Sequence, residues 1–324
     1  MEKIAGLVWA VIAVIIVVVA GIALYMATIL PNVGSAPDIK IERTPGRIVR
    51  GKYLANNVTG CMACHSKRDW TLYAAPVKPG TTGEGGERFD KETDFPGILY
   101  AKNITPYGIG NWSDGELLRA ITEGVTKDRK AIYPLMPYKA YAKMCREDVY
   151  SIIAYLRTLP SVKNDVPQRS LDFPLNFIVN TVPSKATLPA APDSSKISYG
   201  SYLVSIANCV ECHSKMGTAN IVAGSAFGGG WPFQFPNGTI TYAANISPDN
   251  ETGIGQWSRE FFISRFRQYA GSAQNPEAIA ANGFNTTMPW KTYAGMTDED
   301  LSAIYVYLRT VNPIKNKVEK FLRK

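Results

Sequence analysis

The sequence predicts an all-α protein in which an N-terminal transmembrane helix precedes two tandem helical domains. Three observations carry the prediction: an uncharged apolar stretch at residues 4–30, a Cys-x-x-Cys-His motif that occurs twice, and sequence runs that repeat at a spacing of about 150 residues. The repeats divide the chain into a membrane anchor at residues 1–36, a first domain at 37–160, a proline-rich connector at 161–196 and a second domain with a basic tail at 197–324.

The apolar stretch is long enough to cross a membrane. Its 27 residues carry no charge, and as a helix they would span about 40 Å, against about 30 Å for the hydrocarbon core of a bilayer. A cleavable signal peptide is the alternative, because Gly34 and Ala36 imitate its small-residue cleavage site. The apolar core of a signal peptide is usually only about 7–15 residues long. Since Pro37 also follows directly, we favour a retained anchor.

The only two histidines of the chain each close a Cys-x-x-Cys-His motif. The motif residues are Cys61, Cys64 and His65 in the first domain and Cys209, Cys212 and His213 in the second. Each pair of thiols is spaced to form thioethers with the vinyl groups of one haem, and the histidine then offers an imidazole nitrogen to the iron. A zinc site would need further ligands, yet Cys145 is the one cysteine that remains. We therefore predict two covalently bound haem c groups.

Covalent haem c in a chain of bacterial character implies that both domains face the periplasm or outer side of the cytoplasmic membrane. The formal net charge of +8 is unevenly spread: residues 38–160 hold 19 Lys and Arg against 14 Asp and Glu, whereas residues 193–311 hold 7 against 9. No stripe of basic and aromatic residues accompanies this charge, which argues against nucleic-acid binding.

Matched runs in the two copies predict the same helices in each domain. The matches are Gly51-Lys-Tyr-Leu with Gly200-Ser-Tyr-Leu, Tyr100-Ala-Lys-Asn-Ile-Thr-Pro with Tyr242-Ala-Ala-Asn-Ile-Ser-Pro, Gly108-Ile-Gly-Asn-Trp-Ser with Gly253-Ile-Gly-Gln-Trp-Ser, and Ala154-Tyr-Leu-Arg-Thr with Val306-Tyr-Leu-Arg-Thr. A leading helix is expected at about 46–56 and 198–206, and a last helix at about 147–159 and 299–311.

A middle helix is expected to start near Ser113 in the first domain and near Ser258 in the second. Ser113 with Glu116, and Thr297 with Asp300, have the spacing that caps exposed helix amides. With this order of helices around each haem motif, we expect two tandem class I cytochrome c domains.

The remaining segments are expected to be loops. Glycine-rich stretches at 80–86 and 224–230 lack the preceding strand and following helix of a phosphate-binding loop, so close passage over a haem edge or plain flexibility is expected. The connector contains five prolines, which predict a largely extended, non-helical chain. Its apolar part, residues 171–179, is expected to pack across both domains.

The sixth ligand of each iron cannot be a histidine of this chain, because none is left. Methionine is the usual partner in electron carriers, since its soft sulfur raises the potential. Met136 and Met288 occupy matching loops and each precedes a proline, which favours an extended backbone and suits a ligand loop. Met144 and Met296 directly precede the last helices, where a methionine is more often a packing residue. We therefore favour Met136 and Met288 as the ligands.

Three other side chains allow two interpretations each. Cys145 stands where the second copy has the helix cap Thr297, which favours a structural role over that of a regulatory or ligating thiol. Trp112 and Trp257 occupy matching places, where each indole could donate to a haem propionate or pack in the core.

Several of these runs resemble a known family. Asn-Ile-Thr-Pro, Gly-Ile-Gly-Asn-Trp-Ser-Asp, Met-Pro-Tyr, Glu-Asp-Val-Tyr-Ser-Ile-Ile-Ala-Tyr-Leu-Arg and Phe-Pro-Leu-Asn are similar to runs in the membrane-bound cytochrome c subunits of bacterial alcohol, gluconate and aldehyde dehydrogenases, over about residues 45–311. Those proteins commonly carry three haem domains and pass electrons from a periplasmic dehydrogenase subunit to quinone or a later carrier. The resemblance implies that His65, Met136, His213 and Met288 are the axial ligands here. This chain differs in having two haem motifs and an N-terminal apolar segment.

The expected function is electron transfer rather than catalysis. The chain would be a membrane-anchored subunit that passes single electrons from a periplasmic dehydrogenase, or from a quinol-oxidising or other redox partner, to a downstream respiratory acceptor. The alternative is a di-haem redox enzyme. A peroxidase would need an open iron and an acid–base group, for which no histidine remains, and a thiosulfate dehydrogenase type would need an unusual ligand such as Cys145.

Overall fold

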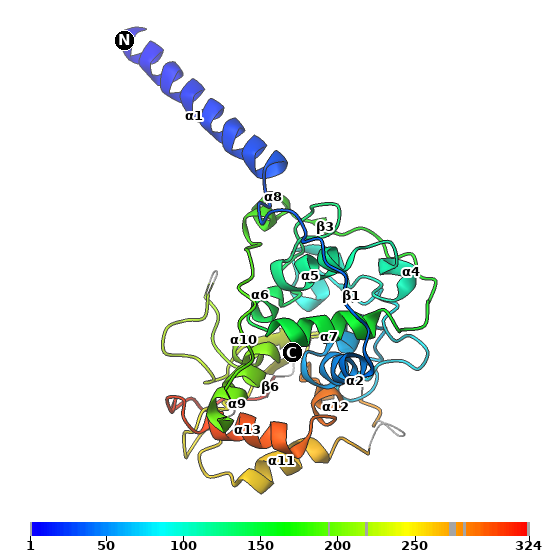
Figure 1. The fold of residues 1–324 in the computed structure, drawn as a ribbon. Helices are drawn as coiled ribbons and strands as arrows, with labels where there is room; N and C mark the ends of the chain where they lie inside the picture. The colour runs from blue at the N-terminus through cyan, green and yellow to red at the C-terminus, as the bar shows by residue number, and fades with distance from the viewer. Residues whose placement is uncertain (1, 194, 218–219, 272–276, 281–282, 323–324) are drawn as a thin grey trace.

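The computed structural model describes residues 2–193, 195–217, 220–271, 277–280 and 283–322. A long helix, α1 (Glu2–Thr28), projects from a body in which two helical halves lie against each other (Figure 1). No residue of α1 is buried, and its mean hydropathy of 3.2 over the best window is high enough for a membrane span. In the rest of the chain helices are the main regular structure, as predicted.

The two halves contain corresponding helices in the same order. The first half has α2 (Pro45–Tyr53), the π-helix η1 (Leu54–Val58), α3 (Cys61–Cys64), α4 (Pro106–Ile109), α5 (Asp114–Glu123), α6 (Tyr138–Tyr141) and α7 (Arg146–Leu156), together with the 3₁₀ turn η2 (Lys91–Thr93). The second half has α9 (Lys196–Ile206), α10 (Cys209–Cys212), α11 (Arg259–Arg267), α12 (Trp290–Tyr293) and α13 (Asp298–Leu308). The expected leading, middle and last helices are all present, with ends displaced by up to three residues.

The cap signals act as predicted in the first half and partly in the second. Ser113 Oγ accepts a hydrogen bond from the Glu116 amide, and the Glu116 carboxylate accepts one from the Ser113 amide, which completes a capping box. Thr297 Oγ1 accepts from the Asp300 amide. The Asp300 carboxylate instead accepts from the Tyr53 hydroxyl of the other half, so the second box is not reciprocal.

The π-helix η1 follows from a difference in spacing between the two copies. Ten residue steps separate Gly51 from Cys61, whereas nine separate Gly200 from Cys209. A helix absorbs one extra residue as a π-turn with little change in direction on either side. In the second half α9 runs without this turn to Ile206. The π-helix thus takes up the extra residue between Gly51 and Cys61.

Glycine lies where the leading and last helices cross in each half. A Cβ at Gly51 would lie 1.8 Å from the Ser151 carbonyl oxygen, and one at Gly200 would lie 2.0 Å from that of Ala303. Only glycine lets the two backbones approach this closely. Around the crossings, buried side chains such as Leu54, Ile153, Leu203 and Leu301 form one core cluster that extends through both halves.

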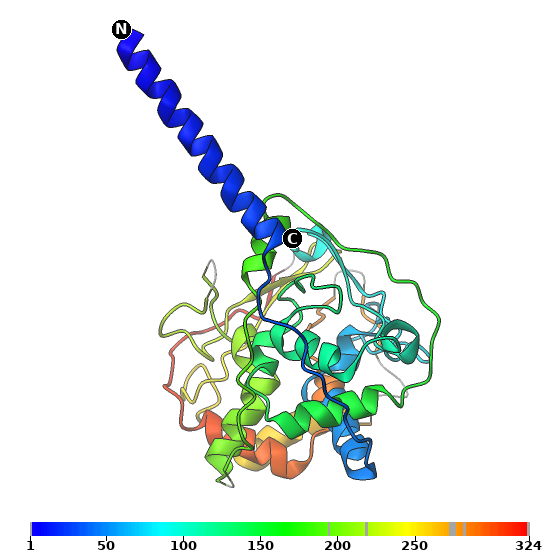
Figure 2. The same ribbon diagram turned by 45° about the horizontal axis from the view of Figure 1, so that its top comes forward.

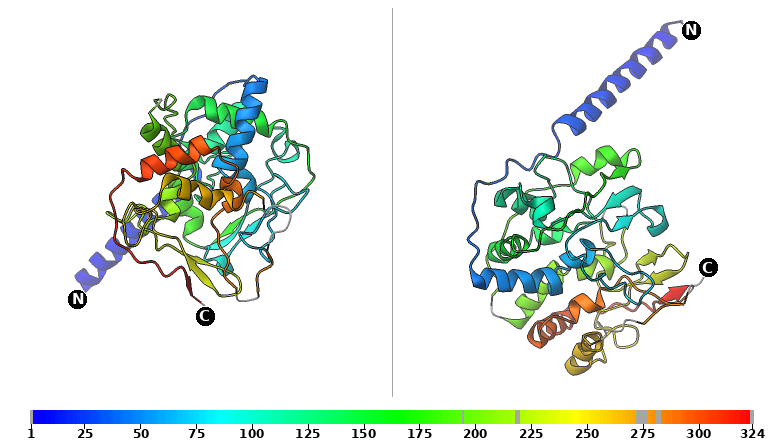
Figure 3. Two further views of the ribbon diagram at one scale, coloured as in Figure 1. Left: turned by 90° about the horizontal axis from the view of Figure 1, so that it is seen from below. Right: turned by 90° about the vertical axis from the view of Figure 1, so that its right-hand side faces the viewer.

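The all-α prediction missed two small sheets. One contains β1 (Arg88–Phe89), β2 (Gly97–Tyr100) and β3 (Ser170–Leu171), and the other contains β4 (Pro232–Gln234), β5 (Ile240–Tyr242) and β6 (Phe321–Leu322). All pairs are antiparallel, and in each sheet the third strand comes from the chain beyond the last helix (Figure 3). Strands of two to four residues are too short to show an alternating pattern in the sequence.

The connector is largely irregular, as predicted, but its apolar part does not pack across both halves. Besides β3 it holds the one-turn helix α8 (Leu175–Ile178) and the 3₁₀ turn η3 (Val179–Thr181). Both contact the foot of α1 instead (Figure 2), and the Phe173 side chain is 82% exposed. The expectation was wrong because the apolar residues of this segment lie beside the apolar helix rather than between the halves.

Candidate functional site

Each Cys-x-x-Cys-His motif forms a single helical turn entered through a left-handed residue. Gly60 has φ +66° before α3, and Asn208 has φ +58° before α10. Glycine and asparagine are the residues that adopt this conformation most readily. The turn places the histidine at its C-terminal end, where the His65 amide donates to the Cys61 carbonyl over 2.9 Å and the His213 amide to the Cys209 carbonyl over 3.0 Å.

The two imidazole rings are oriented by matching main-chain carbonyls. His65 Nδ1 lies 2.6 Å from the Lys102 oxygen, and His213 Nδ1 lies 2.7 Å from the Ala244 oxygen. An Nδ1–H that donates to a carbonyl fixes the tautomer and reserves Nε2 for a metal. Burial lowers the pKa of both histidines, which favours the neutral form that binds iron.

The repeated Asn-Ile-Thr/Ser-Pro run explains how these carbonyls are held. Asn103 Nδ2 donates to the Val162 carbonyl over 2.9 Å, and Asn245 Nδ2 donates to the Ile314 carbonyl over 2.6 Å. Each bond ties the segment that carries the histidine's acceptor, just after β2 or β5, to the chain just beyond the last helix. The asparagine therefore positions the carbonyl of the residue before it, and that carbonyl orients the histidine ring.

The glycine-rich loops are fixed against the motifs. The Gly85 amide donates to the His65 carbonyl over 2.9 Å, and the Gly229 amide donates to the His213 carbonyl over 2.8 Å. A Cβ at Gly85 would lie 2.5 Å from backbone atoms of Lys102 and Asn103, and one at Gly229 would lie 2.5 Å from the backbone of Ala244. Close approach to the chain's own backbone is therefore the reason for these two glycines, while passage over a haem edge stays a prediction.

The four motif cysteines lie in a desolvated environment. Burial raises the pKa of Cys61 to about 11, of Cys209 to about 12 and of Cys212 to about 11, and it also raises that of Cys64. The proximity of Cys64 adds to the rise at Cys212, which places the two motifs near each other across the contact between the halves. The thiols nevertheless remain accessible, because Cys61 and Cys209 are partly exposed and Cys64 and Cys212 are exposed, as bonding to the vinyl groups of a haem requires.

The two pairs of methionines differ in burial: the pair expected to pack in the core is buried, and the pair expected to bind iron is partly exposed. Met144 is 0% exposed and Met296 is 2% exposed, and both are members of the core cluster. Met136 and Met288 are partly exposed and lie at the edge of that cluster, in loops closed by matching bonds of 2.8 Å from the Tyr138 and Trp290 amides to the methionine carbonyls. Their role as ligands stays a prediction, and their availability supports it.

A cationic group beside the first motif fits an anionic substituent such as a haem propionate. Burial lowers the pKa of the Arg169 guanidinium, and it lowers that of Lys102, with Arg169 as a further cause. Among the described residues neither side chain forms an ion pair with a carboxylate, and the buried Tyr138 hydroxyl has no hydrogen-bond partner. Sequence reasoning missed Arg169 because it lies in the connector.

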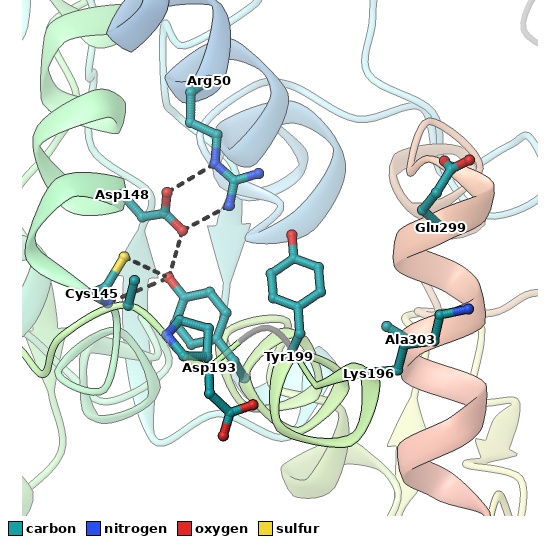
Figure 4. Close-up of a pocket in the computed structure, with 11 residues that line it drawn as sticks. Arg50, Cys145, Asp148, Asp193, Lys196, Tyr199, Glu299 and Ala303 are labelled. Atoms are coloured by element: carbon teal, nitrogen blue, oxygen red, sulfur yellow. Dashed lines mark hydrogen bonds and ion pairs between the residues drawn. The ribbon is translucent and has the colours of Figure 1, made fainter.

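Cys145 lies at the N-cap of α7 and makes no capping bond with its side chain. Its sulfur instead lies 3.5 Å from the Tyr202 hydroxyl oxygen, at a cavity of about 390 Å³ between the halves (Figure 4). Trp112 and Trp257 both pack against the core cluster, and Trp257 meets Phe261 edge-on with ring centroids 4.9 Å apart. These contacts support the structural interpretation of all three residues.

The halves are joined by two matching hydrogen bonds that sequence reasoning did not identify. Tyr53 of α2 donates to Asp300 Oδ2 over 2.5 Å, and Tyr202 of α9 donates to Asp148 Oδ2 over 2.6 Å. Arg50 also donates twice to Asp148, each time over 2.9 Å (Figure 4). Each leading helix thus bonds the last helix of the opposite half. The sequence feature that could have indicated these bonds is the tyrosine that both Gly-x-Tyr-Leu runs contain.

Comparison with known proteins shows the family of this chain. The chain is 30% identical over 269 residues to a di-haem cytochrome c-type protein of Cereibacter sphaeroides. The aligned region covers 79% of this chain and 83% of that protein. The chain belongs to this family of c-type cytochromes. The cytochrome is also 27% identical over 283 residues to the cytochrome c subunit of a quinone-dependent alcohol dehydrogenase from Gluconacetobacter polyoxogenes, and 28% identical over 312 residues to the gluconate 2-dehydrogenase cytochrome c subunit of Pantoea cypripedii.

These alignments cover 82% and 88% of the cytochrome but 56% and 64% of the two dehydrogenase subunits. The cytochrome therefore spans little more than half the length of those relatives. No protein-family model matches the chain. Membership of the family implies covalently bound haem c, and the motif residues described above are chemically suited to it.

Proposed function

We propose that this cytochrome is a membrane-anchored electron-transfer subunit with two haem c groups, which passes single electrons from a periplasmic dehydrogenase or quinol-oxidising partner to a downstream respiratory acceptor. The observation that carries the proposal is the duplicated site, in which a histidine oriented by a main-chain carbonyl follows two accessible cysteine thiols. The names of the dehydrogenase subunits among its relatives support the choice of donor.

In this proposal the two halves are class I cytochrome c domains at residues 37–160 and 197–324, joined by the connector at 161–196. Cys61 and Cys64 attach one haem and Cys209 and Cys212 the other. His65 with Met136, and His213 with Met288, would bind the two irons. Haem c supplies one-electron chemistry at its iron when it is bound. The protein orients each imidazole and offers Arg169 and Lys102 to a propionate of the first haem.

The anchor is proposed to remain attached, with the body on the periplasmic side. Val33 is 7% exposed and Ile41 is 5% exposed, on either side of the imitated cleavage site. Arg119 Nη1 donates to the Gly34 carbonyl over 3.5 Å, and the Ile41 amide donates to Asp114 Oδ2 over 2.9 Å. Residues on both sides of Ala36 are thus buried in or bonded to the folded body. A cleavage after Ala36 would divide this bound segment, so its contacts support retention of α1.

Purification of the full chain in mild detergent from its native membranes tests the function. We expect a dehydrogenase subunit to co-purify, and its substrate to reduce both haems of the complex. As a control, a variant with Cys209→Ala and Cys212→Ala should retain one haem by mass. Rapid turnover of peroxide or thiosulfate by the isolated chain, with no partner present, would contradict the carrier role and support the enzyme alternative.

A further inference from the structure

An uncharged apolar segment lies exposed on the body beside the foot of α1. Residues 173–184 contain no charged side chain. Phe173 is 82% exposed and Ile178 is 42% exposed, whereas Val179 of the same stretch is only 3% exposed. Exposed aromatic and branched aliphatic side chains in one short stretch mark an interaction surface more often than a solvated loop.

This segment is attached to the membrane helix. The Asn180 side-chain amide donates to the Met26 carbonyl over 3.1 Å, in the last turn of α1, and α8 and η3 both contact that helix. Figure 1 shows α8 directly below the foot of α1. The position of residues 173–180 along the membrane normal is therefore set by α1 itself.

The length of α1 then places this segment at the membrane surface. At 1.5 Å per residue, its 27 residues span about 40 Å, roughly 10 Å more than the hydrocarbon core. The excess puts the turn at Met26 in the headgroup region, where the 52% exposed Tyr25 also lies. Aromatic side chains favour that depth, because their rings are apolar and the region is still hydrated.

We propose that residues 173–178 form a second membrane contact, which inserts Phe173 and Ile178 into the lipid interface and limits the tilt of the haem-binding body. The inference rests on the proposed membrane anchor. A lipid surface is the occupant because the segment is continuous with the span and is held at its outer boundary. Asp172, its nearest preceding charge, is paired with Lys91 over 3.3 Å and so does not oppose the contact.

Site-directed spin labelling of the full haem-loaded chain in phosphatidylcholine nanodiscs tests this contact. A nitroxide is placed at Phe173→Cys in a Cys145→Ser background, and its collisions with oxygen and with a water-soluble nickel chelate are compared. Two matched sites serve as references: Val17→Cys in the middle of α1, and Phe261→Cys on α11, which is 49% exposed at the opposite end of the body (Figure 1).

We expect the oxygen-to-nickel ratio at position 173 to be several-fold higher than at position 261 and to approach the ratio at position 17. A water-like ratio at 173 with a lipid-like ratio at 17 would overturn the contact and leave the anchor intact. Protection of the label at 173 from both reagents would mean that protein covers the segment, which also overturns it. A water-like ratio at 17 would overturn the anchor and the contact together.

Discussion

At the residue scale, the two histidines show which parts of a site the sequence contains. The motif names the ligand, because its spacing is dictated by one haem and two thioethers. The acceptors that orient the rings, the Lys102 and Ala244 carbonyls, could not be predicted, because any residue type offers the same oxygen. The adjacent asparagines were visible as part of a repeated run, but their role depends on a bond to the chain about 60–70 residues later.

Arg169 carries a prediction at the same scale. Replacement by Gln removes a half-buried positive charge beside Lys102 and Tyr138. A nearby cation stabilises the reduced state of a redox centre, because that state carries one more electron. We therefore expect Arg169→Gln to lower the midpoint potential of the first haem in a spectroelectrochemical titration.

Two controls accompany this variant. The midpoint potential of the second haem should not change in Arg169→Gln, and Lys130→Gln, at an exposed site, should change neither potential. An unchanged first potential in Arg169→Gln would show that the guanidinium faces no part of the haem.

At the element scale, helix starts were predictable and strands were not. Ser113, Ser258 and Thr297 each cap the helix that their position indicated, since a cap depends on residues within one turn. The strands depend on partners far along the chain: β3 pairs with a strand more than 70 residues earlier. The π-helix was predictable in principle, because Gly51 and Cys61 are ten residues apart while Gly200 and Cys209 are nine apart, which indicates one inserted residue.

The helix crossings give a prediction about stability. Gly51→Ala and Gly200→Ala place a methyl group within 1.8 Å and 2.0 Å of a carbonyl oxygen on the last helix, so the helices must separate. Overpacking of this kind typically costs about 1–3 kcal/mol. We expect each variant to lower the free energy of unfolding by this amount in a denaturant titration followed by circular dichroism.

Gly46→Ala is the matched control, because Gly46 lies in the same helix α2 and a Cβ there meets nothing within 4 Å. It should leave stability unchanged or raise it by up to about 1 kcal/mol. Equal effects at positions 46 and 51 would contradict the close crossing.

At the scale of the whole molecule, the halves are held together by polar contacts whose equivalence follows from the duplication. Tyr53 and Tyr202 are matching residues, as are Asp148 and Asp300, and each pair bonds across the interface. The duplication was evident from the sequence, but the exchange of partners between copies was not. The connector was wrongly expected to fix the halves, because its apolar character gave no sign of which surface it meets.

Removal of these bonds should loosen the halves without unfolding either. A hydrogen bond to a charged group contributes about 1.5–3 kcal/mol. We expect Tyr53→Phe with Tyr202→Phe to weaken the coupled Soret circular dichroism of the two haems, which depends on their relative orientation. Tyr107→Phe removes a 2.8 Å bond from the first half to the exposed Asp165 of the connector, which does not join the two halves, and should leave this signal unchanged.

The same tyrosines predict a loss of stability at high pH. Burial raises the pKa of both Tyr53 and Tyr202 in the folded state, while the unfolded chain loses these protons near pH about 10. Their contribution is therefore complete below that pH and is lost as pH rises above it. The double phenylalanine variant should lose less stability between neutral and strongly alkaline pH than the wild type, and equal losses would contradict the assignment.

The central claim is that two haems are held by His65 with Met136 and by His213 with Met288. The near-infrared sulfur-to-iron charge-transfer band of the oxidised chain tests it most directly. We expect Met136→Ala and Met288→Ala each to remove about half of the band, as one of two methionine-ligated haems is lost. We also expect the double variant to abolish the band, and Met144→Leu with Met296→Leu to leave it intact. A full band in the Met136→Ala, Met288→Ala double variant would contradict the claim.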